Sequence, residues 1–151
     1  MRGMLGDILS EGHQLTIADM EAGLEHLSRS GGTLRHVDLL LVVLEPYRKA
    51  LETARRTLAL ASDLGIPRIY GVASKVQDDD DRKMVDEFAA MLGLPLLASV
   101  PYDDAVRAAD RKGTAIIDEA PDSAAVRSID QLLDRIEVAM NGDGVAQSRS
   151  A

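Results

Sequence analysis

The consecutive apolar residues at positions 39–44, LLLVVL, constrain the fold more than any other stretch of the chain. The run is too short for a typical buried helix, and Glu45 and Pro46 end it. A strand without polar residues is typical of a parallel sheet whose two faces are both covered by helices. The run therefore predicts a buried parallel strand.

The rest of the chain alternates between strand patterns and helix patterns. Short apolar runs predict further strands at residues 15–18, 68–73 and 96–100, and apolar residues at helical spacing predict helices at 48–64, 78–92, 103–109 and 126–140. This alternation predicts an α/β fold, a three-layer sandwich with a largely parallel sheet. With 151 residues the chain fits one domain over residues 1–140, and the Gly and Ser content from position 141 predicts a disordered tail at 141–151.

Composition excludes several classes of function. The net charge of −8 argues against a nucleic-acid-binding surface spread over the domain. The chain contains no cysteine, so it offers neither disulfides nor a thiolate metal site. No apolar run approaches the roughly 20 residues that cross a bilayer, and the first residues lack the apolar core of a signal peptide. We therefore expect a cytoplasmic protein with no nucleic-acid or membrane partner.

Polar residues follow each predicted strand at the point where it ends. They are Asp19, Glu45, the pair Ser74 and Lys75, and the group Pro101, Tyr102 and Asp103. The carboxyl ends of parallel strands share one edge of a sheet, and ligands bind in the crevice outside it. Solvated turns are the alternative, but the convergence favours a binding site. The acidic run at residues 78–81 is more typical of a helix N-terminus than of a metal site, because its carboxylates suit open backbone N–H groups.

The segment DMEAGLEHL at residues 19–27 resembles a segment of a known family. It is similar to the second switch of P-loop ATPases of the MinD/ParA superfamily, most of all the accessory proteins that help insert nickel into carbon monoxide dehydrogenase (the CooC type). The resemblance implies that Asp19 orients Mg²⁺ through its waters. It also implies that the backbone of Gly23 approaches the terminal phosphate, since no Cβ obstructs it.

Two later segments extend the resemblance. Residues 72–76 match the place where these ATPases carry an Asn-Lys pair whose asparagine amide reads adenine, and Ser74 and Lys75 occupy it. Residues 100–106 resemble the loop that packs beside the adenine; this loop contains Pro101, Tyr102 and Asp103. A serine hydroxyl cannot offer adenine the paired donor and acceptor of an amide. The resemblance therefore implies weak selectivity for adenine.

The chain lacks the phosphate-binding loop of this family. No G-x-x-x-x-G-K-[ST] segment occurs in it, and such a loop supplies a nest of backbone N–H groups and a lysine for the phosphates. The family carries the loop upstream of the second switch, so the resemblance implies a truncated P-loop fold without its P-loop strand. We expect ATP with Mg²⁺ to bind weakly and the chain alone to be inactive. The CooC-type metal cysteines are missing too, so no transition-metal site is expected.

Three functions fit these patterns. The first is a CooC-like ATP-binding accessory protein for metalloenzyme maturation. The second is a non-catalytic interaction module, or pseudo-ATPase remnant, that pairs with a full-length homologue. The third is a ParA/MinD-type positioning protein, which is disfavoured because the last predicted helix lacks a basic amphipathic face. Without the central strand, residues 39–44 would expose an unpaired edge, so we expect a homodimer or a complex with a full-length homologue or client metalloenzyme.

Overall fold

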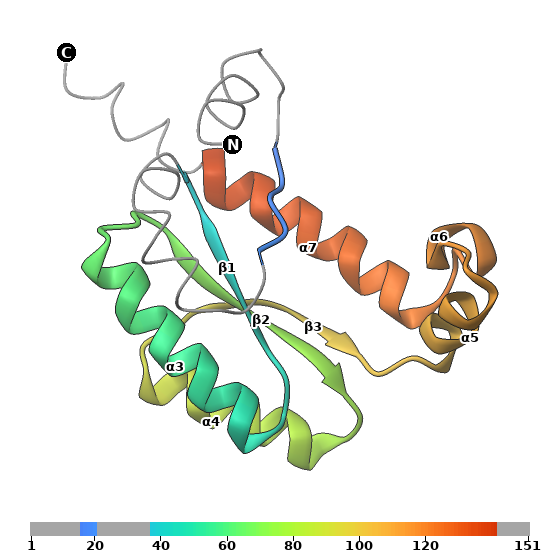
Figure 1. The fold of residues 1–151 in the computed structure, drawn as a ribbon, viewed down its shortest axis with the longest axis horizontal. Coiled ribbons are helices and arrows are strands. Elements are labelled where there is room, and N and C mark those ends of the chain that lie inside the picture. The colour runs from blue at the N-terminus through green and yellow to red at the C-terminus, as the bar shows by residue number, and fades with distance from the viewer. Residues whose placement is uncertain (1–15, 21–36, 142–151) are drawn as a thin grey trace.

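The computed structural model describes residues 16–20 and 37–141 and contains a parallel three-stranded sheet (Figure 1). Its strands are β1 (Leu40–Leu44), β2 (Ile69–Val76) and β3 (Leu96–Pro101), in the spatial order β1-β2-β3. Both pairings are parallel. The apolar run at residues 39–44 therefore forms the predicted parallel strand.

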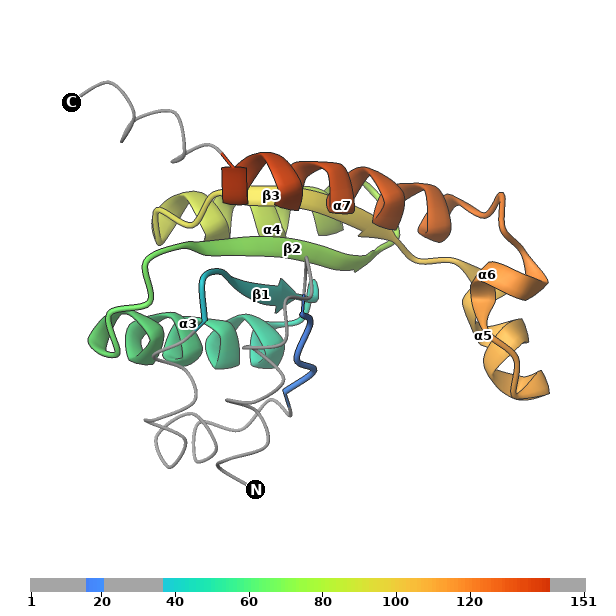
Figure 2. The ribbon, with the colours of Figure 1, turned by 90° about the horizontal axis from the view of Figure 1, so that it is seen from above.

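Helices cover both faces of this sheet (Figures 1 and 2). On one face α3 (Arg48–Asp63) packs on β1 and α4 (Asp79–Met91) packs on β2. On the other face α7 (Ala124–Asn141) lies against β3. Helices α5 (Asp104–Lys112) and α6 (Ile116–Glu119) form a lobe beyond the carboxyl end of β3. The predicted three-layer α/β fold is confirmed; none of the described helices is long and apolar enough to cross a membrane.

An aliphatic core lies between the sheet and the helices α3 and α4. Leu44 and Val85 are fully buried in it, and Ala73 belongs to the same cluster. Gly71 allows close packing at the centre of the sheet, because a Cβ atom there would lie 2.5 Å from Leu96 Cδ2. The small residues of β2 therefore make room for the leucines of its neighbouring strands.

Local chemistry fixes the start of α4, as predicted, and the end of α5. Asp78 caps α4, since its carboxylate accepts a hydrogen bond from the Asp81 N–H at 2.8 Å. In return, Asp81 Oδ2 accepts a hydrogen bond from the Gln77 N–H at 3.0 Å. The acidic run therefore acts as a helix cap. At its own end α5 is followed by Gly113, whose φ of 68° is a left-handed conformation that glycine adopts readily.

Residues 16–18 do not form the predicted first strand. The structure describes residues 16–20 without regular secondary structure, and Ile17 is 75% exposed. Figure 2 shows this segment on the side of β1 that faces away from β2. A parallel strand is held by hydrogen bonds to its neighbour, and none of the described strands pairs with these residues. Leu15, the first residue of that prediction, lies outside the described residues.

Among the described helices, those that cover β1 lie on one of its faces only, whereas the sequence predicted burial on both. Val42 and Leu44 are buried in the cluster that includes α3, but Val43 is 59% exposed. Successive strand residues point to opposite faces, and on the face of Val43 the helix α7 packs against β3. The predicted tail lies outside the described residues apart from Asn141, which ends α7.

Candidate functional site

The carboxyl ends of the three described strands meet at one edge of the sheet. Glu45 follows β1, Lys75 lies near the end of β2 and Tyr102 follows β3. An ion pair of 2.6 Å between Lys75 Nζ and Glu45 Oε1 joins the first two ends. The Tyr102 N–H joins the third by donating to the Val76 carbonyl oxygen at 2.9 Å. These strand ends therefore converge as the parallel sheet requires.

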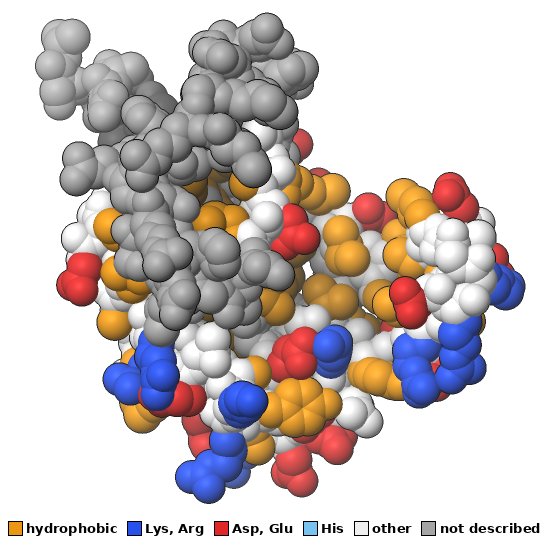
Figure 3. Space-filling view, in the orientation of Figure 1, with side chains coloured by type: hydrophobic (Ala, Val, Ile, Leu, Met, Phe, Trp, Pro, Cys, Tyr) orange, Lys and Arg blue, Asp and Glu red, His pale blue; other side chains and the backbone are white. Residues whose placement is uncertain are grey.

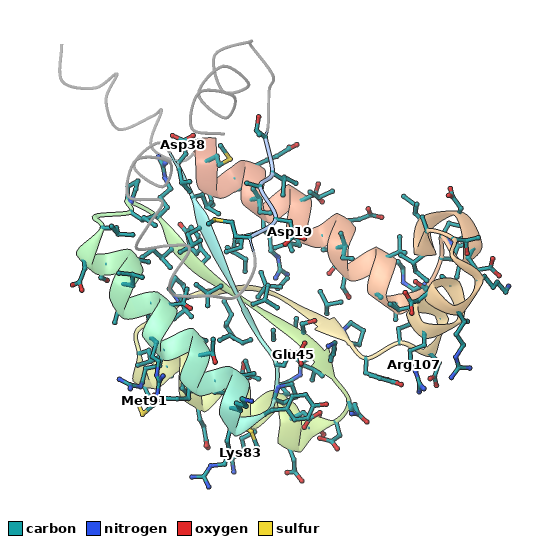
Figure 4. The ribbon with its side chains drawn as sticks, viewed as in Figure 1. Asp19, Asp38, Glu45, Lys83, Met91 and Arg107 are labelled. Carbon is teal, nitrogen blue, oxygen red and sulfur yellow. The ribbon has the colours of Figure 1, made fainter. Side chains whose placement is uncertain are left out.

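The edge borders a hollow in the molecular surface. Figure 3 shows this hollow between the α5–α6 lobe and the body of the molecule, with acidic and basic side chains on its rim. Figure 4 places Glu45 on the side of the body and Arg107 on the side of the lobe. The polar groups of the strand ends thus face a concave region, as expected of a ligand site in an open parallel sheet.

Lys75 has a left-handed backbone conformation with a φ of 58°, which no other non-glycine residue of the described ranges shares. It lies in a β-bulge, where Ser74 and Lys75 of β2 together oppose Val100 of β3. A bulge bends its strand and re-aims the side chains. The predicted strand ended before Ser74, whereas β2 extends to Val76 and includes both bulge residues.

The ion pair of Lys75 does not compensate for its backbone conformation. A left-handed residue other than glycine costs about 1–2 kcal/mol. The Lys75 side chain is 55% exposed and that of Glu45 is 30% exposed, and such a solvent-accessible pair contributes about 0–1 kcal/mol. The hydrogen bond to Glu45 raises the pKa of Lys75 above its ordinary value. Strain that stability does not explain is typical of functional positions.

Ser74 and Tyr102 bring hydroxyl groups to the same edge. Ser74 is partly buried, and its hydroxyl forms no hydrogen bond within the described part of the chain. The Tyr102 hydroxyl accepts a hydrogen bond from Arg107 Nη1 at 2.9 Å and donates one to Asp104 Oδ1 at 3.3 Å. The hydrogen bond to Tyr102 raises the pKa of Arg107. Ser74 is therefore available to a ligand, while the ring of Tyr102 is held in place by its neighbours.

Asp103 ties together the first turns of α5 and α7. Its Oδ1 accepts a hydrogen bond from the Ala105 N–H at 2.9 Å, and its Oδ2 accepts one from the Ala125 N–H at 3.1 Å. These hydrogen bonds, led by that from Ala105, lower the pKa of the Asp103 carboxyl. Both carboxylate oxygens are thus engaged by the main chain, so Asp103 shapes the loop through its support of two helix ends.

The lowered pKa of Asp103 makes thermal stability depend on pH. A carboxyl with a depressed folded pKa stabilises the protein above its unfolded pKa, and this contribution is lost as pH falls through the folded value. We expect Asp103→Asn to melt roughly 2–5 °C lower than wild type near neutral pH. Below about pH 4 the two melting temperatures should converge. Thermal unfolding at several pH values measures this, with Glu87→Gln on α4 as the control; parallel curves for wild type and Asp103→Asn would contradict it.

Asp19 lies apart from the ion pair at the strand ends. Its carboxylate is exposed and forms no hydrogen bond or ion pair with the described residues. Figure 4 shows Asp19 and Glu45 well separated. Within residues 16–20 and 37–141 no group of three or more acidic or histidine side chains could hold a metal ion. The roles of Asp19 and of Gly23, which lies outside the described residues, stay predictions.

Sequence reasoning missed two contacts of this site. Glu45 was recognised as a polar residue at a strand end, but its pairing with Lys75 was not predicted. Arg107, which binds the Tyr102 hydroxyl, was not singled out at all. The sequence contained a signal for the first contact, because Glu45 directly follows one apolar run and Lys75 follows the next one after a single serine.

Two curated relatives share more than a third of the aligned residues with the chain. It is 39% identical over 121 residues to the carbon monoxide dehydrogenase accessory protein CooC of Rhodospirillum rubrum, and 37% identical over 136 residues to an uncharacterised ATP-binding protein of Methanocaldococcus jannaschii. The solved MinD of Pyrococcus horikoshii, in complex with Mg-ADP, has the same fold, with a TM-score of 0.73 at 16% identity. The chain is a CooC-like relative of the MinD/ParA-superfamily P-loop ATPases. The predicted family resemblance is confirmed.

The CooC-like chain spans about half the length of these relatives. The aligned region covers 80% of the chain and 44% of CooC, and 90% of the chain and 51% of the M. jannaschii protein. The MinD superposition covers 89% of the chain and 54% of MinD. A ParA family ATPase of Chlorobium tepidum matches with a TM-score of 0.58 at 28% identity, over 67% of the chain and 43% of its own. No family model matches the chain.

Proposed function

We propose that this CooC-like chain is the switch-II half of an ATP-binding accessory protein for metalloenzyme maturation, which serves nickel insertion into carbon monoxide dehydrogenase. The observation that supports this most directly is the 39% identity to CooC, an accessory protein of that enzyme, over 80% of the chain. The chain has no cysteine, so nickel, as cargo, is held by a partner in this proposal.

The described residues suit the base end of a nucleotide better than its phosphate end. The unbonded Ser74 hydroxyl offers a donor and an acceptor, and the next residue, Lys75, is held by Glu45 in an ion pair. Pro101 and Tyr102 add apolar and aromatic surface at the neighbouring strand end. For the phosphates, the sequence has no Gly-rich loop that ends in Lys-Ser or Lys-Thr. In this proposal Asp19 would hold the hydrated Mg²⁺ that accompanies the phosphates, and the nucleotide, when bound, would supply the phosphoryl chemistry.

In this proposal hydrolysis requires phosphate contacts that residues 1–151 do not provide. A full-length homologue, a client metalloenzyme or a second copy of the chain are the candidate partners. The positions that the family uses for the base lie in β2 and after β3, whereas Asp19 lies beyond β1. A partner that supplies the phosphate-binding loop would therefore have to lie between β1 and Asp19, on the side of β1 that faces away from β2.

Replacement of Ser74 by asparagine is expected to restore base selectivity. An amide that pairs with adenine gives about 1–3 kcal/mol of base discrimination. Calorimetric titration should show weak and similar affinities of the wild type for MgATP and MgGTP. Ser74→Asn should bind MgATP at least about fivefold more tightly, with little change for MgGTP. The control Ser128→Asn, on α7, should behave as wild type; micromolar MgATP affinity in wild type, with MgGTP at least about tenfold weaker, would contradict the proposal.

A second candidate function is a non-catalytic interaction module that pairs with a full-length homologue. The observation in its favour is the free side of β1, which pairs only with β2 among the described strands and carries the exposed Val43. Nucleotide titration separates the two candidates, because an interaction module assembles without binding nucleotide.

A positioning role of the ParA/MinD type has less support, since the likeness to MinD at 16% identity concerns the fold alone.

A further inference from the structure

The Glu45–Lys75 ion pair differs from the other ion pairs of the described residues. The others lie within one helix or join α5 to α6, whereas this pair ties the carboxyl ends of two strands together. Its lysine occupies a left-handed position where glycine or asparagine would be unstrained. The chain thus keeps a strained lysine at a place where the backbone alone would favour another residue.

The bulge decides which way Ser74 points. Side chains alternate between the two faces of a strand, so the extra residue of a bulge changes the face for the residues around it. Ser74 is the first bulge residue and Lys75 is the second. Because Glu45 holds the Lys75 side chain from the neighbouring strand, it also restrains the backbone that carries the unbonded Ser74 hydroxyl.

We propose that Lys75, held by Glu45, is a positioning residue that presents Ser74 to the nucleotide base and so determines base affinity at this site. This inference rests on the proposed nucleotide-binding function. Lys75 acts through the backbone of the bulge, and its ammonium stays on Glu45 when the base binds. A contact of this kind preorganises the site, which reduces the cost of ordering it when the ligand arrives.

Three variants separate positioning from mere stabilisation. Lys75→Gly removes the ammonium and relieves the left-handed strain, so its melting temperature should equal or exceed that of wild type. Its affinity for MgATP should nevertheless fall at least about fivefold, because glycine leaves the bulge free to sample other conformations. Glu45→Gln should weaken MgATP to a similar degree. The reversed pair, Glu45→Lys with Lys75→Glu, should recover most of the affinity; Glu87→Gln, which removes one exposed charge on α4, should change nothing.

Hydrogen exchange of the ligand-free protein reports on the ion pair itself. The Tyr102 N–H donates to the Val76 carbonyl directly after the bulge, so its hydrogen exchange should become faster in Glu45→Gln and stay unchanged in Glu87→Gln. NMR of the full chain measures this exchange, and titration with MgATP in the same samples gives the affinities.

The outcomes are distinct. Faster exchange with weakened MgATP binding, reversed in the charge-swapped pair, supports the proposal. Unchanged exchange, unchanged affinity in Lys75→Gly, or failure of the reversed pair to recover affinity would each overturn it. Absence of nucleotide binding in wild type would overturn the proposed function and the role of Lys75 in it, while the exchange data would still show whether Glu45 orders the bulge.

Discussion

Purified wild-type chain is expected to release phosphate from MgATP no faster than buffer. In P-loop enzymes the phosphates are held by a nest of backbone N–H groups and by a lysine, and the sequence contains no such loop. Loss of a single preorganised donor to a developing charge costs about 10²–10³-fold in rate, so loss of the whole loop should remove measurable turnover. A phosphate-release assay on the full chain measures this.

The Asp19→Ala variant serves as the control for contamination. Because the wild type is expected to be inactive, the variant should give the same background rate. Phosphate release that exceeds background in wild type and disappears in Asp19→Ala would contradict the prediction. It would mean that this chain supplies its own phosphate contacts.

The chain is expected to have about twice its monomer mass of 16.2 kDa in light scattering at micromolar concentration. On its side away from β2, β1 pairs with no other strand of the described residues. Val43, exposed on one face of this strand, adds apolar surface next to that edge. Apolar burial stabilises by about 25 cal/mol per Å², so a further strand with its side chains would contribute several kcal/mol. An open edge of this kind is a template for pairing with another chain.

A matched pair of variants tests whether the dimer contact lies at β1. Val43→Glu places a charge on the exposed face of the edge strand β1 and should shift the chain to monomer. Val138 on α7 is 72% exposed, so Val138→Glu adds the same charge away from the edge and should leave the mass unchanged. A monomeric wild type with a cooperative thermal transition would contradict the prediction. Dissociation by Val138→Glu alone would place the contact on α7 instead.

Local sequence chemistry predicted the parts of the fold that depend on nearby residues. The apolar run at residues 39–44 identified a strand of the parallel sheet, because such runs are typical of parallel strands, although the described helices cover this strand on one face only. Asp78 and Asp103 were expected to begin helices, and both accept hydrogen bonds from backbone N–H groups of the first helical turn. At the other end of α5, Gly113 has the left-handed φ that is common where helices end.

The predictions that failed concern features that depend on residues far away in the sequence. The run at residues 15–18 has the composition of a strand, yet strand formation requires a neighbour, and none of the described strands pairs with it. Val43 is exposed because α7 packs on β3, which no local pattern reveals. The left-handed conformation of Lys75 follows from the register between β2 and β3. The candidate site was therefore predictable as a set of strand ends, but the contact between Glu45 and Lys75 was not.

Residue-resolved NMR of the full chain during titration with MgATP tests the central claim most directly. Weak binding is readily followed in this way, and each amide reports its own position. The account predicts saturable shifts, with a dissociation constant of about 0.1–1 mM, centred on the amides of Ser74, Lys75 and Tyr102. The amides of α4 residues such as Lys83 should not shift. No saturable shifts at these strand ends, or shifts centred on another surface, would contradict the claim that this chain handles a nucleotide.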